Sequence, residues 1–151
     1  MDKIIKLDIN DFEKCSNIWN MNENEKLKDT LYKELLNNER VTFVYVKDGE
    51  YIAEVSIVFD KNDEDYTIKG KRLYVSRMIV KEELRGNGYS KILMNFIIDY
   101  AKRNKYEELS IGVNIDNYIA LKLYVELGFT KIQFIGEDSD GKFFKLIKSL
   151  K

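Results

Sequence analysis

Two glycines in a short polar segment form the part of the sequence best suited to bind an anion. The segment Arg85-Gly86-Asn87-Gly88-Tyr89-Ser90 follows a strand-like run that ends at Val80 and precedes an amphipathic helical pattern. Small residues let backbone N–H groups approach a phosphate closely. The start of a helix adds unpaired N–H groups and about half a positive charge. The pattern therefore predicts a site for an anion, in particular a diphosphate.

The spacing separates this turn from two better-known phosphate-binding loops. A dinucleotide-binding fingerprint requires glycine or alanine at the position that Lys91 occupies. A P-loop requires Gly-Lys followed by Ser or Thr, and this segment lacks that order. Taken alone, the turn is also compatible with a glycine turn that binds no ligand.

A second motif supports the ligand-binding interpretation. The downstream residues with characteristic spacing are Asn117, Ala120, Leu123, Tyr124, Gly128 and Phe129. Their pattern resembles the motif Asn-x-x-Ala-x-x-Leu-Tyr-x-x-x-Gly-Phe of the GNAT superfamily of N-acetyltransferases. The earlier turn resembles the Arg/Gln-x-x-Gly-x-Gly/Ala motif of the same family, with Ser90 at its last position. The two motifs stand in the family's order, and the resemblance covers roughly residues 73–135.

The resemblance implies that acetyl-coenzyme A is the cosubstrate and that no metal is required. The residues whose backbone amides would hold the pyrophosphate are Arg85, Gly86, Asn87, Gly88, Tyr89 and Ser90. The strand at Met78, Ile79 and Val80 would pair its backbone with the pantetheine arm, as an added strand pairs with a sheet edge. Asn117 would contact the pantetheine or the adjacent chain, and it also suits a helix N-cap.

Tyr124 is the catalytic residue that the resemblance implies, as the donor of a proton or a hydrogen bond to the departing thiolate. A thiolate of pKa ~8.5 leaves more easily beside a phenol of pKa ~10. The attacking amine, with a pKa of ~10.4, must also lose its proton. Because the central strand around Arg72 to Met78 holds no acid, Glu54 on the preceding strand is the candidate base. A solvent-facing strand position is the alternative interpretation of Glu54.

The expected function is direct transfer of an acetyl group to a primary amine of a small molecule or a peptide. Two alternatives remain: an acetyltransferase toxin that modifies aminoacyl-tRNA, and a non-catalytic domain that senses an acyl-CoA. Glu23 and Glu25 in a polar loop would attract a cationic amine. Lys71, Arg72 and Arg77 would instead favour an acceptor that also carries an acidic group.

Composition restricts the remaining classes of protein. A chain of 151 residues is expected to form one domain, residues 1–151. The 25 basic and 26 acidic residues nearly cancel, which disfavours nucleic acid as a partner. With one cysteine, Cys15, and no histidine, a zinc site is not expected. Cys15 shares a helical spacing with Phe12, Ile18 and Trp19, which favours a small buried residue over a reactive thiol. No apolar run approaches the ~18 residues of a membrane span, so a cytoplasmic monomer or homodimer is expected.

Hydrophobic periodicity predicts elements in the order β-α-α-β-β-β-α-β-α-β-β. The predicted strands cover residues 3–7, 41–46, 51–59, 73–80, 109–113, 129–135 and 143–147. The Asp48-Gly49 pair between the second and third of these predicts a tight hairpin. The predicted helices cover residues 10–19, with Asn10 or Asp11 as N-cap, and residues 27–36, 92–101 and 117–127. The second of these has an apolar stripe of Leu27, Leu31, Leu35 and Leu36. The strand-helix-strand unit at residues 73–113 implies one parallel strand pair. The expected architecture is an α/β (α+β) GNAT fold, with a mixed, mostly antiparallel sheet of six to seven strands and flanking helices.

Overall fold

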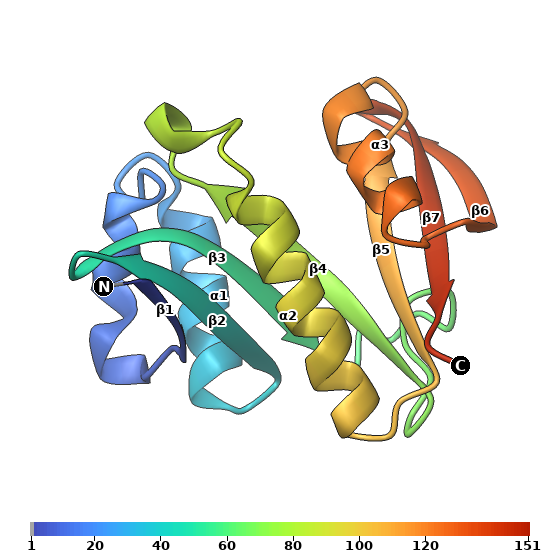
Figure 1. Ribbon diagram of the computed structural model, residues 1–151, viewed down its shortest axis with the longest axis horizontal. Helices are drawn as coiled ribbons and strands as arrows, with labels where there is room; N and C mark the ends of the chain where they lie inside the picture. Colours follow the sequence, from blue (N-terminus) through green and yellow to red (C-terminus); the bar gives the residue numbers. More distant parts are fainter. Residues whose placement is uncertain (1) are drawn as a thin grey trace. The chain divides into compact units, whose positions relative to one another are not determined.

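The computed structural model describes residues 2–151 and contains the elements in the predicted order (Figure 1). The strands are β1 (Asp2–Lys6), β2 (Arg40–Lys47), β3 (Glu50–Val58), β4 (Arg72–Val80), β5 (Glu108–Asn114), β6 (Lys131–Asp138) and β7 (Gly141–Ser149). The α-helices are α1 (Glu25–Leu36), α2 (Tyr89–Arg103) and α3 (Tyr118–Glu126). Two 3-10 helices, η1 (Ile9–Asn17) and η2 (Glu82–Leu84), complete the set.

The seven strands form one mixed sheet in the order β1-β2-β3-β4-β5-β7-β6. Strand β4 pairs parallel with β5, with Leu73 opposite Leu109 and Val75 opposite Ile111. The pairs β1–β2, β5–β7 and β6–β7 are antiparallel. The predicted mixed sheet and its parallel pair are therefore confirmed.

The chain divides into two compact units. The first comprises Met1–Ile57 and Arg77–Met94, and the second comprises Val58–Ser76 and Asn95–Lys151. Strand β4 starts in the second unit and ends in the first, whereas α2 starts in the first unit and ends in the second. The glycine turn at residues 85–90 thus belongs to the first unit, and the motif around Tyr124 belongs to the second.

In the first unit, η1 and α1 pack on strands β2 and β3 through an apolar cluster (Figure 1). Its members include Phe12, Cys15, Trp19, Leu31 and Val44. Burial of Cys15 agrees with the prediction of a small core residue. Leu36 departs from the predicted apolar stripe, because it lies at the last turn of α1 and is 55% exposed.

The first predicted helix is a 3-10 helix with a different cap. Asp8, rather than Asn10 or Asp11, is the N-cap, and its carboxylate accepts a hydrogen bond from the Asn10 backbone N–H at 2.9 Å. An aspartate oxygen satisfies one of the unpaired N–H groups of a first turn. The turn between β2 and β3 is the predicted hairpin. Asp48 and Gly49 have φ values of 52° and 82°, as a two-residue type I′ turn requires.

In the second unit, the motif residues fix both ends of α3. The Asn117 side chain accepts a hydrogen bond from the Ala120 backbone N–H at 3.2 Å, so the predicted N-cap is confirmed. Gly128 follows α3 with a φ of 100°, a conformation that glycine adopts without strain. This turn directs Phe129 into the core, where it is fully buried. Both final strands are longer than predicted and approach one another closely, with Asp138 opposite Gly141.

Arg72 is a buried cation that joins β4, β5 and the preceding loop. Its guanidinium group contacts the Glu108 carboxylate, with nitrogen–oxygen distances of 3.0 and 3.1 Å. It also donates a hydrogen bond of 2.6 Å to the Glu64 carbonyl oxygen. These partners compensate for the loss of hydration that burial of a charge entails. Arg72 is therefore part of the scaffold and does not face an acceptor.

We expect Arg72→Met to lower the free energy of unfolding by about 2–4 kcal/mol, because Glu108 and the loop carbonyls lose their partner in a partly buried setting. Chemical denaturation of both proteins measures the change. Lys71→Met, which removes the same charge from the exposed neighbouring side chain, should change stability by less than about 0.5 kcal/mol. Equal effects of the two substitutions would contradict the scaffold role.

Candidate functional site

The turn between η2 and α2 has the backbone geometry of an anion cradle. Gly86 and Gly88 have φ values of 85° and 86°, in the left-handed region that side chains disfavour. A Cβ atom built on either glycine would meet no protein atom within 4 Å, so both residues face open space. The first backbone N–H groups of α2 have no intrahelical acceptor. The turn therefore has both the room and the donors that a phosphate group needs.

Side-chain hydrogen bonds hold this turn in place. The Asn87 amide donates a hydrogen bond to the Leu84 carbonyl oxygen at 2.9 Å. Arg85 donates from Nε to the Val80 carbonyl oxygen at 3.2 Å. The Tyr89 ring packs edge-on against Tyr45 of β2, with centroids 4.9 Å apart. These contacts occupy side chains and leave the backbone of the two glycines exposed.

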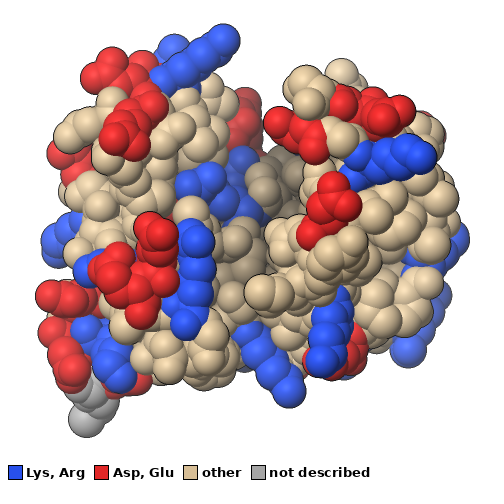
Figure 2. Space-filling view, turned by 90° about the horizontal axis from the view of Figure 1, so that it is seen from above, with Lys and Arg blue, Asp and Glu red and all other residues tan. Residues whose placement is uncertain are grey.

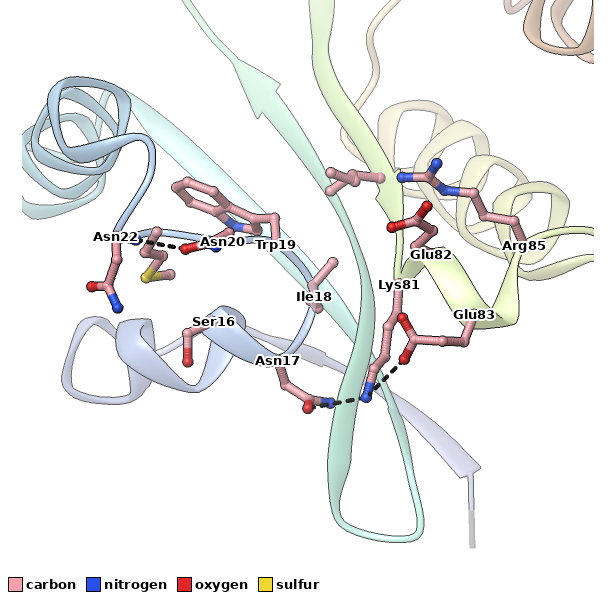
Figure 3. A pocket seen from close by; sticks show the side chains of 12 residues that line it. Ser16, Asn17, Ile18, Trp19, Asn20, Asn22, Lys81, Glu82, Glu83 and Arg85 are labelled. Atoms are coloured by element: carbon pink, nitrogen blue, oxygen red, sulfur yellow. Dashed lines mark hydrogen bonds and ion pairs between the residues drawn. The ribbon is translucent and has the colours of Figure 1, made fainter.

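A pocket of about 570 Å³ adjoins the turn within the first unit (Figure 3). One wall is the segment from Ser16 to Asn22, and the other consists of Ile79, Lys81, Glu82, Glu83 and Arg85. Trp19 and Ile79 give this pocket an apolar part. Its lysine, Lys81, pairs with Glu83 at 3.6 Å and donates to the Asn17 side chain at 3.2 Å.

Glu54 is buried, contrary to the solvent-facing alternative. Its carboxylate lies 3.6 Å from Nε of Arg77, and the two side chains are 6% and 19% exposed. The Arg77 guanidinium group also stacks on Trp19, 4.6 Å from a ring centroid. Burial raises the pKa of the Glu54 carboxyl group, and the positive charges of Arg77 and Arg40 oppose the shift. Arg77 is thus already paired with an acid and stacked on an aromatic ring.

Tyr124 lies on the buried face of α3 in the second unit. It is 8% exposed, and its ring meets Phe129 edge-on with centroids 6.1 Å apart. Burial raises the pKa of Tyr124 to about 12, with a further contribution from the nearby Tyr74. The hydroxyl group is therefore neutral at physiological pH and available as a hydrogen-bond donor.

The predicted site residues fall into two groups. Glu54, the strand segment 78–80 and the turn 85–90 belong to the first unit, while Asn117 and Tyr124 belong to the second unit. Sequence reasoning missed the pairing of Glu54 with Arg77 and the proximity of Tyr74 to Tyr124. Neither has a local sequence signal, because each depends on residues from different strands or helices.

Other kinds of site are absent from the described residues 2–151. They contain no group of three or more acidic, cysteine or histidine side chains placed to hold a metal ion. No helix in this part of the chain has the length and hydrophobicity to cross a bilayer. On the face that Figure 2 shows, acidic and basic side chains are interspersed, as the near-zero net charge leads one to expect.

Comparison with known proteins agrees with the fold and the motifs. The model of the acetyltransferase (GNAT) family matches residues 2–129. The chain therefore belongs to the GNAT acetyltransferase family. It is an acetyl-CoA-dependent N-acetyltransferase, and the open glycine turn fits the pyrophosphate of that cosubstrate.

The curated relatives are matched over different shares of their length. The N-alpha-acetyltransferase 30 of Saccharomyces cerevisiae is 28% identical over 125 residues, which is 80% of this chain and 70% of that protein. Three further relatives, from human and zebrafish, are matched over only 30–31% of their length.

Two solved structures are similar over nearly the whole chain. An aminoglycoside 6'-acetyltransferase type Ii has a TM-score of 0.79 at 16% identity, covering 99% of this chain and 97% of that chain. The PaiA N-acetyltransferase of Thermoplasma acidophilum, in complex with coenzyme A, has a TM-score of 0.70 at 20% identity, covering 99% of each chain. At these identities the likeness concerns the fold.

Proposed function

We propose that the protein transfers the acetyl group of acetyl-CoA directly to a primary amine of a small molecule or a peptide. The observation that carries the proposal is the turn at Gly86 and Gly88, whose positive φ values and open surroundings suit a pyrophosphate. In the reaction, the amine nitrogen bonds to the acetyl carbon, the carbon–sulfur bond breaks, and coenzyme A leaves as a thiolate.

In this proposal the end of β4 and the turn hold the cosubstrate. The backbone of Met78, Ile79 and Val80 pairs with the pantetheine arm. The backbone amides from Arg85 to Ser90 bind the pyrophosphate, aided by the positive end of α2. Lys81 continues the ladder to β3, because its N–H donates to the Ile52 carbonyl oxygen at 2.8 Å. This bond fixes the end of β4 immediately before the turn. Asn117 contributes to the pantetheine side while it caps α3.

Tyr124 acts in this scheme as a hydrogen-bond donor to the departing sulfur. A phenol of pKa about 12 lies about 3.5 units above a thiol of pKa ~8.5, so complete proton transfer would cost roughly 5 kcal/mol. A hydrogen bond to the developing thiolate avoids that cost and still stabilises its charge in the transition state. Burial in the second unit suits this role, since it keeps the phenol protonated.

Glu54 is our candidate for the group that accepts the amine proton. Burial raises its pKa toward the range in which a carboxylate is an effective base at neutral pH. The positive charge of Arg77 opposes that rise and favours the ionised form of the carboxylate.

The direct test of the proposed function is release of free coenzyme A thiol when acetyl-CoA is mixed with a panel of amines. Turnover with small amines or peptide N-termini supports the proposal. Binding of acetyl-CoA without turnover would indicate an acyl-CoA sensor, and turnover confined to aminoacyl-tRNA would indicate a toxin.

Gly88→Val should abolish binding of acetyl-CoA, because a side chain would enter the cradle and force an unfavourable φ. A ligand at 100 times its Kd stabilises a protein by about 2.7 kcal/mol. We expect that stabilisation in the parent and none in the variant, measured as the ligand-induced rise in Tm.

Gly70→Val is the matched control, because Gly70 also has a positive φ, 73°, and open surroundings, but lies outside the turn. It should lower the Tm through backbone strain and keep the response to acetyl-CoA. An unchanged response in Gly88→Val would remove the pyrophosphate assignment.

Tyr124→Phe should lower kcat by roughly 10²–10⁴ while the Kd for acetyl-CoA changes little, because the ring that packs on Phe129 remains. The thiol-release assay and a ligand titration give the two quantities. A decrease in kcat of less than about threefold would show that the thiolate leaves without this hydroxyl group.

Glu54→Gln should remove the acidic limb of the pH profile of kcat and lower the plateau by roughly 10²-fold or more, because no carboxylate remains to accept the proton. Glu50→Gln, at an exposed position of the same strand, serves as the control and should preserve both. A folded Glu54→Gln variant that keeps the parent's acidic limb would assign the base elsewhere.

A further inference from the structure

A second pocket, of about 360 Å³, lies in the second unit. Its walls include three aromatic rings and three polar side chains, namely Tyr66, Tyr74, Phe143, Asn114, Asp138 and Asp140. Asn114 lies at the end of β5, whereas Asp138, Asp140 and Phe143 belong to the β6–β7 hairpin. The hairpin lies beyond residue 129, where the match to the family model ends. This pocket therefore involves residues that the family motifs do not describe.

The charge of the pocket is negative. Lys145 is its one basic lining residue, and it already pairs with Asp63 at 2.9 Å and Asp65 at 3.1 Å. Within the described part of the chain, Asp138 and Asp140 form no ion pair. The Asn114 side chain holds the hairpin by donating to the Asp140 carbonyl oxygen at 3.0 Å. Asp138 and Asp140 therefore line the pocket without a cationic partner. Oδ1 of Asp138 also accepts a hydrogen bond from the Asp140 backbone N–H at 2.9 Å, which helps to hold the hairpin in position.

The aromatic wall is also suited to cations. The rings of Tyr66 and Tyr74 lie 4.2 Å apart between centroids. Lysines of the protein itself already use these rings, with Lys145 at 4.9 Å from the Tyr66 centroid and Lys61 at 5.8 Å from that of Tyr74. An ammonium group over a tyrosine ring gains cation–π energy in addition to its attraction to carboxylates.

Tyr74 relates the pocket to the catalytic candidate Tyr124. Tyr74 lines the pocket and lies close enough to Tyr124 to contribute to the raised pKa of its phenol. The Tyr66 hydroxyl oxygen lies against β5 at Gly112, where a Cβ atom would come within 2.6 Å of it. The glycine at that position leaves room for the aromatic wall.

We propose that this pocket binds a positively charged group of the acceptor other than the amine that is acetylated, so that the acceptor is a diamine or polyamine. The anchoring amine and the attacking amine need opposite protonation states. Carboxylates stabilise an ammonium ion and keep it protonated, whereas the attacking amine must be neutral. An amine held by Asp138 and Asp140 is therefore a poor nucleophile and a good anchor. This inference rests on the proposed acetyl transfer to amines.

The test compares 1,4-diaminobutane with butylamine, which has the same chain but no second charge. The thiol-release assay should give a kcat/KM for the diamine at least about tenfold higher. Asp138→Asn combined with Asp140→Asn should lower the diamine value by about five- to tenfold and change the butylamine value by less than twofold. High salt should also lower the ratio of kcat/KM for the diamine to kcat/KM for butylamine in the parent protein.

A charge-matched control separates the pocket from the general field of the protein. Asp116→Asn combined with Glu137→Gln removes two exposed charges nearby in sequence that do not line the pocket. This control should retain the preference for the diamine. The proposal would be overturned if both double variants lowered kcat/KM for the diamine equally. It would also be overturned if Asp138→Asn with Asp140→Asn lowered kcat/KM equally for the diamine and for butylamine.

Failure of the pocket and failure of the proposed function give different results. If no amine supports thiol release, the proposed function fails, and calorimetric titration with 1,4-diaminobutane still tests the pocket. Binding that the Asp138/Asp140 double variant weakens at least about fivefold supports the pocket. Absence of binding in the parent, or equal binding in the parent and the double variant, overturns it.

Discussion

Two guanidinium groups on strand β4 set the constraint on which much of the structure depends. Arg72 pairs with Glu108 in the second unit, and Arg77 pairs with Glu54 in the first. A buried charge that loses its partner is costly, so each pair strongly favours one register of β4 against its neighbour. The residues at the end of the strand, and the glycine turn that follows it, depend on that register. The ion pairs thus help to set the position of the strand end and of the turn that we propose as the pyrophosphate site.

The parts of the fold that could be predicted from sequence are those with local causes. The Asp48-Gly49 hairpin follows from a dipeptide that tolerates positive φ, and the N-cap of α3 follows from Asn117. The turn at Gly86 and Gly88 was predictable as a turn, because two glycines between a strand-like run and a helical pattern favour the positive φ values that both adopt. The 3-10 form of the helix at residues 9–17 could not be predicted, because the same apolar spacing fits a 3-10 helix and an α-helix over so short a segment.

The environment of each ionisable group could not be predicted, since it depends on contacts between distant segments. From sequence, Glu54 on an alternating strand was compatible with either face. The apolar cluster beneath η1 and α1 places it in the interior, beside a cation. Likewise, Arg72 and Arg77 were candidates for contact with an acidic substrate until their pairing with glutamates became visible. Because both cations are paired within the protein, neither is free to bind an acidic group of an acceptor.

Cys15 has a practical consequence for enzymology. It is the single cysteine of the chain, it is fully buried, and burial together with the nearby Glu54 charge raises the pKa of its thiol. Because the thiolate is the reactive form, chromogenic disulfides and maleimide dyes have no accessible target on the folded protein. Such reagents therefore report the coenzyme A product alone. The protein also needs no added reductant to stay in one redox form, which removes the usual interference with these reagents.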